Sequence, residues 1–285
     1  MAKVLMFHRV LPEKKITQPN AYSTFGTLIS QEYFESVLSF LIDNGFEFAT
    51  VSELTRQSST DRLVALTFDD GYSDNFDFAL PSLLKFNATA TFFPVVNPCK
   101  DNTVLPLDIY YQCVDEMDLS ETERAEYISG TTKRKFYWTE PDKQIDMLNL
   151  IFKALPQKNK VSYMSAKQLK ELSDKGFEIG SHGMTHSLLI ADYMDEEKAL
   201  IELQISKQWL ESVTGKPVTA YCFPAGRYDA EMIELAKQVG YTSTCLVVRN
   251  ENVKEALPSY ERIFVKPNSF DELKTVVPPK IRTTS

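Results

Sequence analysis

The chain has 285 residues, of which 43% are hydrophobic and 25% charged, and its formal net charge is −8. This length and composition predict a soluble globular protein with a sizeable core, built as one large domain or two small ones. The acidic balance and the absence of a basic block argue against a nucleic-acid-binding protein. No apolar run has the length of a transmembrane segment, and the opening MAKVLMFHRVLPEKK is interrupted too early to be a signal peptide, so we expect a cytoplasmic protein. The four cysteines lie apart without a C-x-x-C spacing, which predicts free thiols.

The first half of the chain contains a strand, a helix and then further strands. A strand is expected at Val4–Phe7, and SQEYFESVLSFLIDNGFEFATV then places five apolar residues on one helical face. Ser30 is the expected N-cap and Gly45 the stop of that helix, with a strand directly after it. Two more apolar runs, Leu63–Phe68 and Thr89–Val95, are expected to be strands.

The rhythm breaks between about residues 99 and 161. LPLDIYYQCVDEMDLSETERAEYISG and PDKQIDMLNLIFKAL are typical of amphipathic helices, and the basic and aromatic stretch TTKRKFYW separates them. We interpret 99–161 as a helical insertion, either a cover or side subdomain, or an ordinary insertion with no role in chemistry. Since no flexible linker divides the chain, residues 1–285 are predicted to form a single domain that carries this insertion.

The second half returns to alternating helices and strands. Ser165 and Asp229 are expected N-caps, Gly176 and Gly240 the matching stops, and strands should follow at 177–181 and from about 242. Further strands are expected at Val218–Phe223 and Arg262–Val265. This alternation predicts the α/β class with a mostly parallel sheet, either open or closed into a barrel.

Two adjacent carboxylates end one of the buried strands. In LVALTFDDGYSDN the apolar run is followed by Asp69, Asp70 and Gly71. Neighbouring anions at a buried strand end repel each other and lose hydration, so one of them needs a proton, a cation or a metal nearby. The simpler interpretation of D-D-G is a turn signal.

A pair of histidines follows another predicted strand. His182 and His186 lie in SHGMTHS, directly after FEIG. If this segment is helical, the H-x-x-x-H spacing puts both imidazoles on one side, about one turn apart, within reach of one ion. The alternative is two unrelated histidines. However, both this pair and the aspartates lie at the carboxyl ends of predicted parallel strands, where ligands bind in α/β folds.

Together the two motifs predict a catalytic metal site. One carboxylate and two imidazoles leave coordination positions open for water and substrate, which suits zinc or a similar divalent ion such as Co, Ni or Mn. One aspartate would ligate the metal, and the other would accept a proton from a water whose pKa the metal lowers.

These motifs resemble those of a known family. TFDDGYSDN, then SHGMTH, then CFPAGRYD, in this order, look like the polysaccharide deacetylases, also called carbohydrate esterase family four. The resemblance runs from VLMFHRV to about YERIFV and is weakest over 99–161. It implies a distorted (β/α)7 barrel with a metal at the carboxyl-terminal mouth, and an enzyme that removes acetyl groups from glycans.

The resemblance also implies a role for several residues. Asp69 corresponds to the general base, and Asp70, His182 and His186 correspond to the metal ligands. The segment FPAGRYD matches the motif whose main-chain N–H binds the tetrahedral oxyanion, which here is the amide of Ala225.

Two departures from the family pattern concern the base and the acid. Many members have an arginine that pairs with the base at the position of Cys222, and either Arg227 or Arg262 is a candidate replacement. Many members also supply a general-acid histidine late in the chain, but no histidine follows His186 here. VLMFHRV instead resembles a circularly permuted branch in which an N-terminal strand carries that acid, which would be His8. The competing interpretation is a buried histidine satisfied by the backbone.

The substrate is less well defined by the sequence. Removal of an N-acetyl group from an amino sugar, oligosaccharide or surface-glycan precursor is the expected reaction. The alternatives are a metal-dependent deformylase or amidase, a sugar O-acetyl esterase, and an inactive glycan-binding relative. Tyr72, Tyr228 and Arg227 are the candidate substrate-binding residues, with Tyr221 a further aromatic near the motifs. TTKRKFYW is a candidate for peripheral membrane contact, although solvated surface is the simpler interpretation. The oligomeric state and the native metal are not indicated.

Overall fold

The computed structural model describes residues 2–18, 20–57, 61–140, 143–156, 160–190, 193–247 and 256–277. All strand pairings among these residues that belong to a ladder are parallel. The strands are β1 (Lys3–Phe7), β2 (Arg9–Leu11), β3 (Leu28–Ser30), β4 (Glu47–Ala49), β5 (Leu63–Asp70), β6 (Thr91–Pro94), β7 (Glu178–Ile179), β8 (Ala220–Cys222), β9 (Ser243–Leu246), β10 (Ser259–Glu261) and β11 (Ile263–Phe264).

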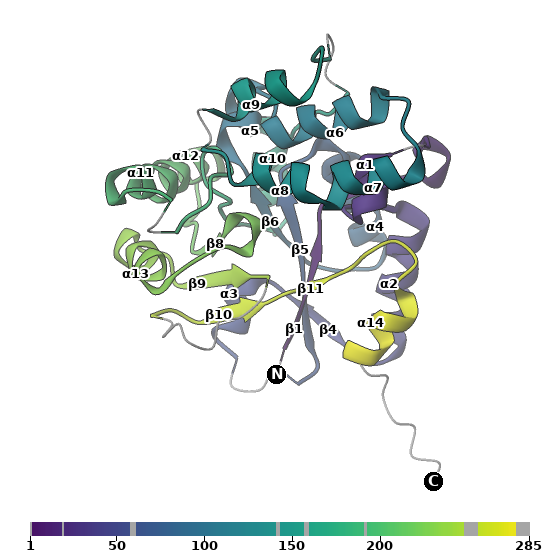
Figure 1. Ribbon diagram of the computed structural model, residues 1–285. Helices are drawn as coiled ribbons and strands as arrows, with labels where there is room; N and C mark the ends of the chain where they lie inside the picture. Colours follow the sequence, from purple (N-terminus) through teal and green to yellow (C-terminus); the bar gives the residue numbers. More distant parts are fainter. Residues whose placement is uncertain are drawn as a thin grey trace.

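Helices connect these strands (Figure 1). In the first half they are α1 (Ala21–Phe25), α2 (Gln31–Asp43), α3 (Val51–Leu54), α4 (Leu80–Lys85), α5 (Val96–Asp101), α6 (Pro106–Glu116), α7 (Glu121–Ser129), α8 (Thr131–Tyr137) and α9 (Gln144–Ile151). In the second half they are α10 (Ala166–Asp174), α11 (Glu196–Leu200), α12 (Ser206–Thr214), α13 (Ala230–Val239) and α14 (Phe270–Val276). Short π-helical turns at Asn75–Ala79 and Ile201–Ile205 precede α4 and α12. Within the described ranges, no helix combines the length and the apolar character needed to cross a membrane.

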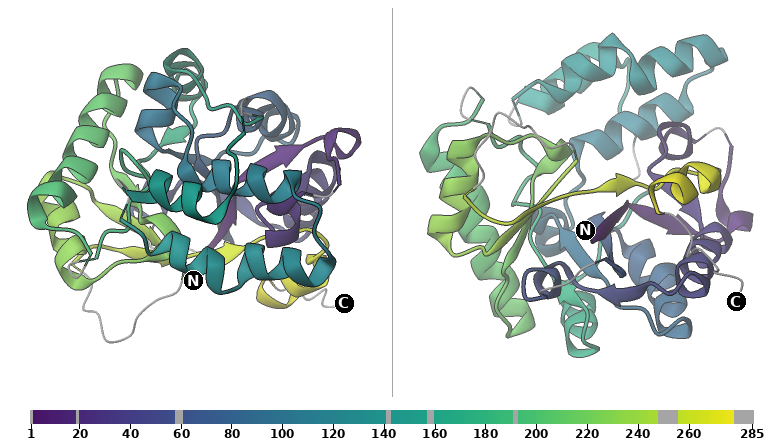
Figure 2. Two further views of the ribbon diagram at one scale, coloured as in Figure 1. Left: turned by 45° about the horizontal axis from the view of Figure 1, so that its top comes forward. Right: turned by 90° about the horizontal axis from the view of Figure 1, so that it is seen from below.

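The strands form a distorted (β/α)7 barrel, as the family resemblance implied. One sheet has the order β11-β1-β5-β6-β7 and another the order β10-β9-β8. The parallel bridge between Ser181 and Tyr221 joins β7 to β8, and the chain passes directly from β10 to β11 at Arg262. These two junctions close the ring, which is seen along its axis in the right-hand view of Figure 2. The strands of this ring therefore present their carboxyl ends to the same mouth, whereas β2 and β3 form a separate two-stranded sheet.

The predicted N-caps of three helices are confirmed by hydrogen bonds to the first helical turn. The Ser30 side chain accepts from Tyr33 N at 3.0 Å, and the Asp229 side chain accepts from Met232 N at 2.9 Å, so both are N-caps as expected. Ser165 forms a capping box with Gln168. These bonds span three residues, which is why the sequence alone indicates them.

Several predicted strands are shorter in the structure, and two of these differences lie next to the site. The strand expected at 177–181 is only Glu178–Ile179, and beyond it the chain still bonds to β6 through Gly180 N and His182 N while Ser181 bonds to β8. A Cβ on Gly180 would collide with the Phe93 ring. The strand expected at 262–265 is only Ile263–Phe264 (β11), and Arg262 lies between it and a further short strand, β10, which was not predicted.

The region between β6 and β7 is helical, but its division differs from the prediction. The first expected helix is two, α6 and α7, and the stretch TTKRKFYW is itself mostly helix α8 rather than a separator. The helices α6, α7 and α8 lie over the mouth of the barrel (Figure 1 and the left view of Figure 2). The carboxylate of Asp108 on α6 anchors them, because it accepts hydrogen bonds from the hydroxyls of Tyr22, Tyr72 and Tyr163 inside the protein.

Candidate active site and metal centre

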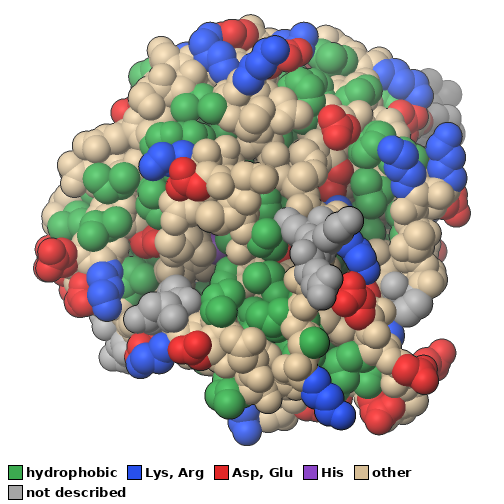
Figure 3. Space-filling view, turned by 90° about the horizontal axis from the view of Figure 1, so that it is seen from above, with side chains coloured by type: hydrophobic (Ala, Val, Ile, Leu, Met, Phe, Trp, Pro, Cys, Tyr) green, Lys and Arg blue, Asp and Glu red, His purple; other side chains and the backbone are tan. Residues whose placement is uncertain are grey.

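A cavity of about 440 Å³ opens at the carboxyl ends of the strands. Its floor carries side chains from the ends of four strands: His8 after β1, Asp69 and Asp70 at the end of β5, His182 after β7, and Arg262 after β10. The barrel thus brings together residues that are far apart in the sequence. In the view from above, apolar side chains surround the hollow (Figure 3).

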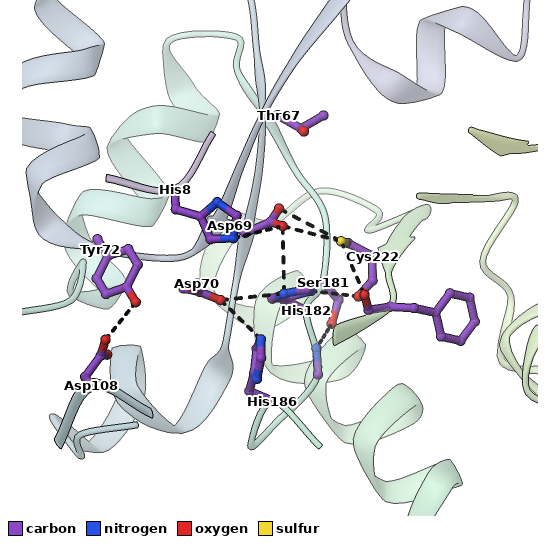
Figure 4. Close-up of polar contacts among 12 residues, drawn as sticks. His8, Thr67, Asp69, Asp70, Tyr72, Asp108, Ser181, His182, His186 and Cys222 are labelled. Carbon is purple, nitrogen blue, oxygen red and sulfur yellow. Dashed lines mark hydrogen bonds and ion pairs between the residues drawn. The ribbon is translucent and has the colours of Figure 1, made fainter. Parts of the chain in front are cut away.

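Three side chains converge as a candidate metal site. Asp70 Oδ1 lies 3.6 Å from His182 Nε2 and 3.5 Å from His186 Nε2, and all three ligand atoms lie within 4.8 Å of one another (Figure 4). Asp70 Oδ1 is buried and has no hydrogen-bond partner among the described residues. Burial, and then the charge of Asp69, raise the pKa of Asp70 well above its usual value. A buried, unpartnered carboxylate oxygen that faces two imidazole nitrogens fits a divalent cation.

The backbone is strained where these groups project. Asp70, His186 and Ala225 have positive φ angles of 70°, 67° and 53°, which non-glycine residues seldom adopt. Gly71, with a φ of 80°, lies against β6, and a Cβ there would come within 2.9 Å of Cys99 Sγ and of Pro94 Cβ. Such strain persists only where surrounding contacts enforce it, and it concentrates at functional sites.

Hydrogen bonding to the backbone orients the His182 imidazole. Its Nδ1 lies 2.7 Å from the carbonyl oxygen of Cys222, so Nδ1 carries the proton in that bond and Nε2 faces Asp70. Burial is the main reason that the pKa of His182 is lowered, which favours the neutral form that ligates metals. The ring therefore has the tautomer and direction that a metal ligand needs.

The loop between the two histidines is not helical, so the condition under which the spacing would place the imidazoles one helical turn apart is not met. The rings nevertheless converge, with centroids 5.0 Å apart. Buried Glu202 holds the loop, accepting from Met184 N at 2.6 Å and from Thr185 N at 3.1 Å. The first amides of α5 donate to the carbonyls of residues 183 and 184 from the other side. Glu202 lies in a π-helical turn, a feature common at functional sites.

Asp69 forms a buried ion pair with Arg262. The two guanidinium NH₂ groups donate to the two carboxylate oxygens at 2.7 Å each. Burial by itself would raise the pKa of Asp69, but the Arg262 charge, followed by that of His182, outweighs it and holds the pKa well below its usual value. Of the two arginines considered as replacements at the Cys222 position, Arg262 is the one that pairs with Asp69. Arg227 instead lies over the Trp138 ring, 5.4 Å from its centroid.

His8 faces the same carboxylate. Its Nε2 lies 3.9 Å from Asp69 Oδ2, and its ring contacts Phe264. Its Nδ1 is buried without a hydrogen-bond partner among the described residues, so the interpretation of a histidine satisfied by the backbone does not describe this ring. Burial lowers the pKa of His8 to about 4, although Asp69 acts in the opposite direction. The imidazole is consequently neutral at pH 7 in this state.

A second group of potential ligands, Asp69, His182 and Cys222, also lies within 4.8 Å. It is the weaker candidate for two reasons. Arg262 already engages both oxygens of Asp69, and burial raises the pKa of the Cys222 thiol well above its usual value. A protonated thiol is a poor metal ligand. The four cysteines are all buried and free, as expected.

The candidate substrate-binding residues do not all lie in the cavity. Arg227 and Ala225 line it, as does Tyr72. However, Tyr72 is buried, stacks on Tyr163 and donates to Asp108, so it forms the wall rather than a platform for a sugar ring. Tyr228 packs beside Phe223 and is not among the described residues that line the cavity. Tyr221, at the bridge to β7, is likewise fully buried.

Three residues that matter at the site were not identified from the sequence. Glu202 occurs in an unremarkable helical stretch and gave no signal. Asp108 is the third residue of α6, where acids are common for reasons of helix polarity, so its buried role was hidden. Lys133 lies in the stretch interpreted as solvated surface or membrane contact, yet it is buried and lines the cavity.

Comparisons with known proteins agree with the geometry. The family model described as "Polysaccharide deacetylase" matches residues 56–244. A Bacillus subtilis (strain 168) protein named "Putative polysaccharide deacetylase YxkH" is 22% identical over 243 residues, a match that covers 84% of this chain and 61% of that protein. The structure of Streptococcus pyogenes deacetylase PplD in complex with acetate superposes with a TM-score of 0.64 at 20% identity, covering 96% of this chain and 97% of that one. IcaB from Ammonifex degensii gives 0.63 at 18% identity, with coverages of 96% and 95%. Both structures share the fold of this chain.

Proposed function

The chain belongs to the polysaccharide deacetylase family. On that premise we propose that it is a metal-dependent hydrolase that removes an acetyl group from an amino sugar, oligosaccharide or surface-glycan precursor. The acetyl group is proposed to be N-linked in preference to O-linked. The observation that supports this most directly is the division of labour between the two aspartates. Asp70 Oδ1 faces two imidazole nitrogens, whereas Asp69 is held apart by Arg262. A binding protein would have little use for that second, ionised carboxylate. The acetate bound to PplD is the product of such a reaction and is consistent with the proposal.

In the proposed enzyme, Asp70, His182 and His186 hold the metal. One oxygen and two nitrogen donors suit zinc, with Co, Ni and Mn as alternatives. Such a cation supplies a lowered pKa for a bound water and polarises the acetyl carbonyl. The buried, unpartnered oxygen of Asp70 is the feature of this chain that fits it.

The protein groups around the metal then perform acyl transfer to water. Asp69 accepts the proton of the attacking water, and Arg262 keeps its carboxylate ionised and correctly oriented for this. Ala225 lines the cavity, and its amide is proposed as the donor to the developing oxyanion. A donor of this kind lowers the barrier by about 3–4 kcal/mol.

His8 is proposed as the acid that protonates the leaving amine or alkoxide, a role that rests on the family resemblance. Because its pKa is about 4 in this state, it has no spare proton at pH 7 and must gain one during the reaction. The nearest source is Asp69, whose Oδ2 lies 3.9 Å from His8 Nε2 and which has just accepted a proton from water. The proton removed from water is thereby delivered to the leaving group.

Two substitutions test the assignment of roles. Asp69→Asn should retain the metal and reduce acetate release by about 10²–10⁴-fold or more, since only the base is lost. His182→Ala should lose both metal and activity, because a ligand is removed. Metal content by elemental analysis and acetate release from a panel of acetylated sugars are the two measurements. Equal metal loss in the two variants would overturn the division of roles.

The same panel distinguishes the alternative reactions. Release of formate from N-formyl sugars in preference to acetate would favour a deformylase, and exclusive cleavage of O-acetyl sugars would favour an esterase. If the zinc-loaded protein binds these sugars but releases neither product, the chain is an inactive relative.

A further inference from the structure

Helix α8 places a cationic side chain inside the cavity. Lys133 is 6% exposed and lines the cavity together with the floor residues of the candidate active site. Its Nζ bonds the hydroxyl of Tyr111 and lies 3.1 Å from the centroid of the Phe25 ring. The same cavity lining contains His8 and Asp69.

This ammonium has no anionic partner in the described part of the chain, where no carboxylate lies within 4 Å of Nζ. Buried lysines are normally paired, because desolvating an ammonium is costly. Burial alone lowers the pKa of Lys133 from 10.5 to about 7. A phenol and two aromatic faces offset only part of this loss. The fold therefore keeps this amine buried at the cavity without a counter-charge, so that a bound anion would favour its protonated form.

The charge of the cavity as a whole has the same sign. Its described lining contains four cations, Lys133, Arg134, Arg227 and Arg262, and only two carboxylates, Asp69 and Asp70. The whole chain, in contrast, has a net charge of −8. A divalent cation on Asp70 would add to the positive potential. An excess of positive over negative side chains in a cavity attracts anionic ligands.

We propose that Lys133 is a specificity-determining residue that binds an anionic substituent, a phosphate or a carboxylate, on the sugar that carries the acetyl group or on its neighbour. This deepens the proposed function and depends on it for the identity of the reaction. The exposed Arg134 and Arg227 lie around the same cavity and attract the same anion, while the apolar walls contact the sugar. The helical region 99–161 thus selects the substrate through α8.

The chain offers a matched control on the same helix. Lys135 lies two residues after Lys133, is exposed and is not among the described residues that line the cavity. Lys133→Met removes the charge and keeps a long apolar chain against Phe25, whereas Lys133→Arg keeps the charge. Lys135→Met removes one surface charge from the same helix.

The test compares kcat/KM for four sugars on the zinc-loaded protein: N-acetylglucosamine, its 1-phosphate, its 6-phosphate and the corresponding uronic acid. The wild type should prefer at least one anionic sugar to the neutral one. The ratio of anionic to neutral kcat/KM should fall roughly 10- to 100-fold in Lys133→Met, mainly through KM, because a charge-assisted hydrogen bond is lost. Lys133→Arg should recover most of the preference, and Lys135→Met should match the wild type. The phosphate and carboxylate arms identify which anion is bound.

Two results would overturn the proposal. One is a wild type that does not prefer any of the anionic sugars. The other is a Lys133→Met variant that loses the same factor on all four sugars, since that describes a structural role.

A binding measurement separates this proposal from the proposed function. Calorimetric titration of the same sugars into the metal-loaded Asp69→Asn variant, with and without Lys133→Met, does not require turnover. If an anionic sugar binds in a way that depends on Lys133 but the wild type releases no acetate, the proposed anion site is supported and the proposed deacetylase activity is refuted. Acetate release without Lys133-dependent binding would refute the anion site alone, and the absence of both would refute both.

Discussion

The ion pair between Arg262 and Asp69 is the contact whose removal should reveal most about the site. Arg262→Met deletes a guanidinium that is 1% exposed in its side chain and donates two hydrogen bonds at 2.7 Å to a carboxylate that is 2% exposed. The substitution leaves the side chains of Asp70, His182 and His186 untouched. It therefore separates the support of the general base from the binding of the metal.

The expected loss of stability is large. Each hydrogen bond to a charged group contributes about 1.5–3 kcal/mol, and breaking one partner from a buried pair costs about 3–5 kcal/mol, because the remaining charge is uncompensated. We therefore expect Arg262→Met to lower the free energy of unfolding by about 3–5 kcal/mol at pH 7. The double variant with Asp69→Asn should recover most of this loss, since it buries no unpaired charge.

Urea unfolding of the single and double variants measures the coupling, and elemental analysis and acetate release complete the assay. Arg262→Met should keep the metal and lose most of its activity, because the carboxylate of Asp69 is no longer held ionised and oriented. Arg124→Met is the control. It removes an arginine that pairs with Asp115 at 3.2 Å and is not among the described residues that line the cavity, so it should cost less stability and no activity.

The reasoning would be refuted by a single variant that unfolds within about 1 kcal/mol of the wild type, well below the range for a broken buried pair. It would equally be refuted by a double variant no more stable than Arg262→Met. Loss of the metal in Arg262→Met alone would show that the pair supports the ligands rather than the base.

Three further predictions concern residues around the site. Glu202→Gln weakens the hydrogen bonds that hold the loop between the histidines, and it should reduce zinc affinity by about 10–100-fold in a chelator competition. The same substitution at the exposed Glu196 should leave zinc affinity unchanged. Equal zinc affinities of the two variants would refute this role of Glu202. Asp108→Asn replaces the carboxylate that accepts hydrogen bonds from three tyrosine hydroxyls by an amide. Amide hydrogen exchange across α6 to α8 should then be faster than in the control Asp118→Asn, which changes an exposed residue. Equal exchange rates in the two variants would refute the role of Asp108 in holding these helices. The pKa of Lys133 is about 7 in the folded protein and about 10.4 in the unfolded chain, so the unfolded state binds more protons between these values. The free energy of unfolding should therefore rise from pH 7 to pH 10 by more in the wild type than in Lys133→Met. Equal rises in the two proteins would contradict this.

The catalytic motifs could be predicted from the sequence because each of them directly follows a predicted strand. The aspartates end a run of apolar residues, and the histidine pair follows another. In a parallel barrel all strand ends meet at one mouth, so their convergence follows from the class of fold alone. The helix caps at Ser30, Ser165 and Asp229 were equally accessible, since each bond reaches only three residues ahead.

The positions of the insertion and of its charged residues could not be predicted in this way. TTKRKFYW looks like surface because five of its eight residues are threonine, lysine or arginine, and nothing local marks Lys133 as the one that turns inward. Only the packing of α8 against α1 and α6 places its ammonium between Phe25 and Tyr111.

The sequence by itself determined the family, the barrel class and the groups that would perform the chemistry, because these depend on local patterns and on the common direction of parallel strands. The tertiary structure decided which charges are paired. Arg262 meets Asp69 across 193 residues only because the ring closes between β10 and β11, and Glu202 reaches the histidine loop only through a π-helical turn. Which buried charges form ion pairs depends on the distance between them in space, and that distance depends on how the whole barrel closes.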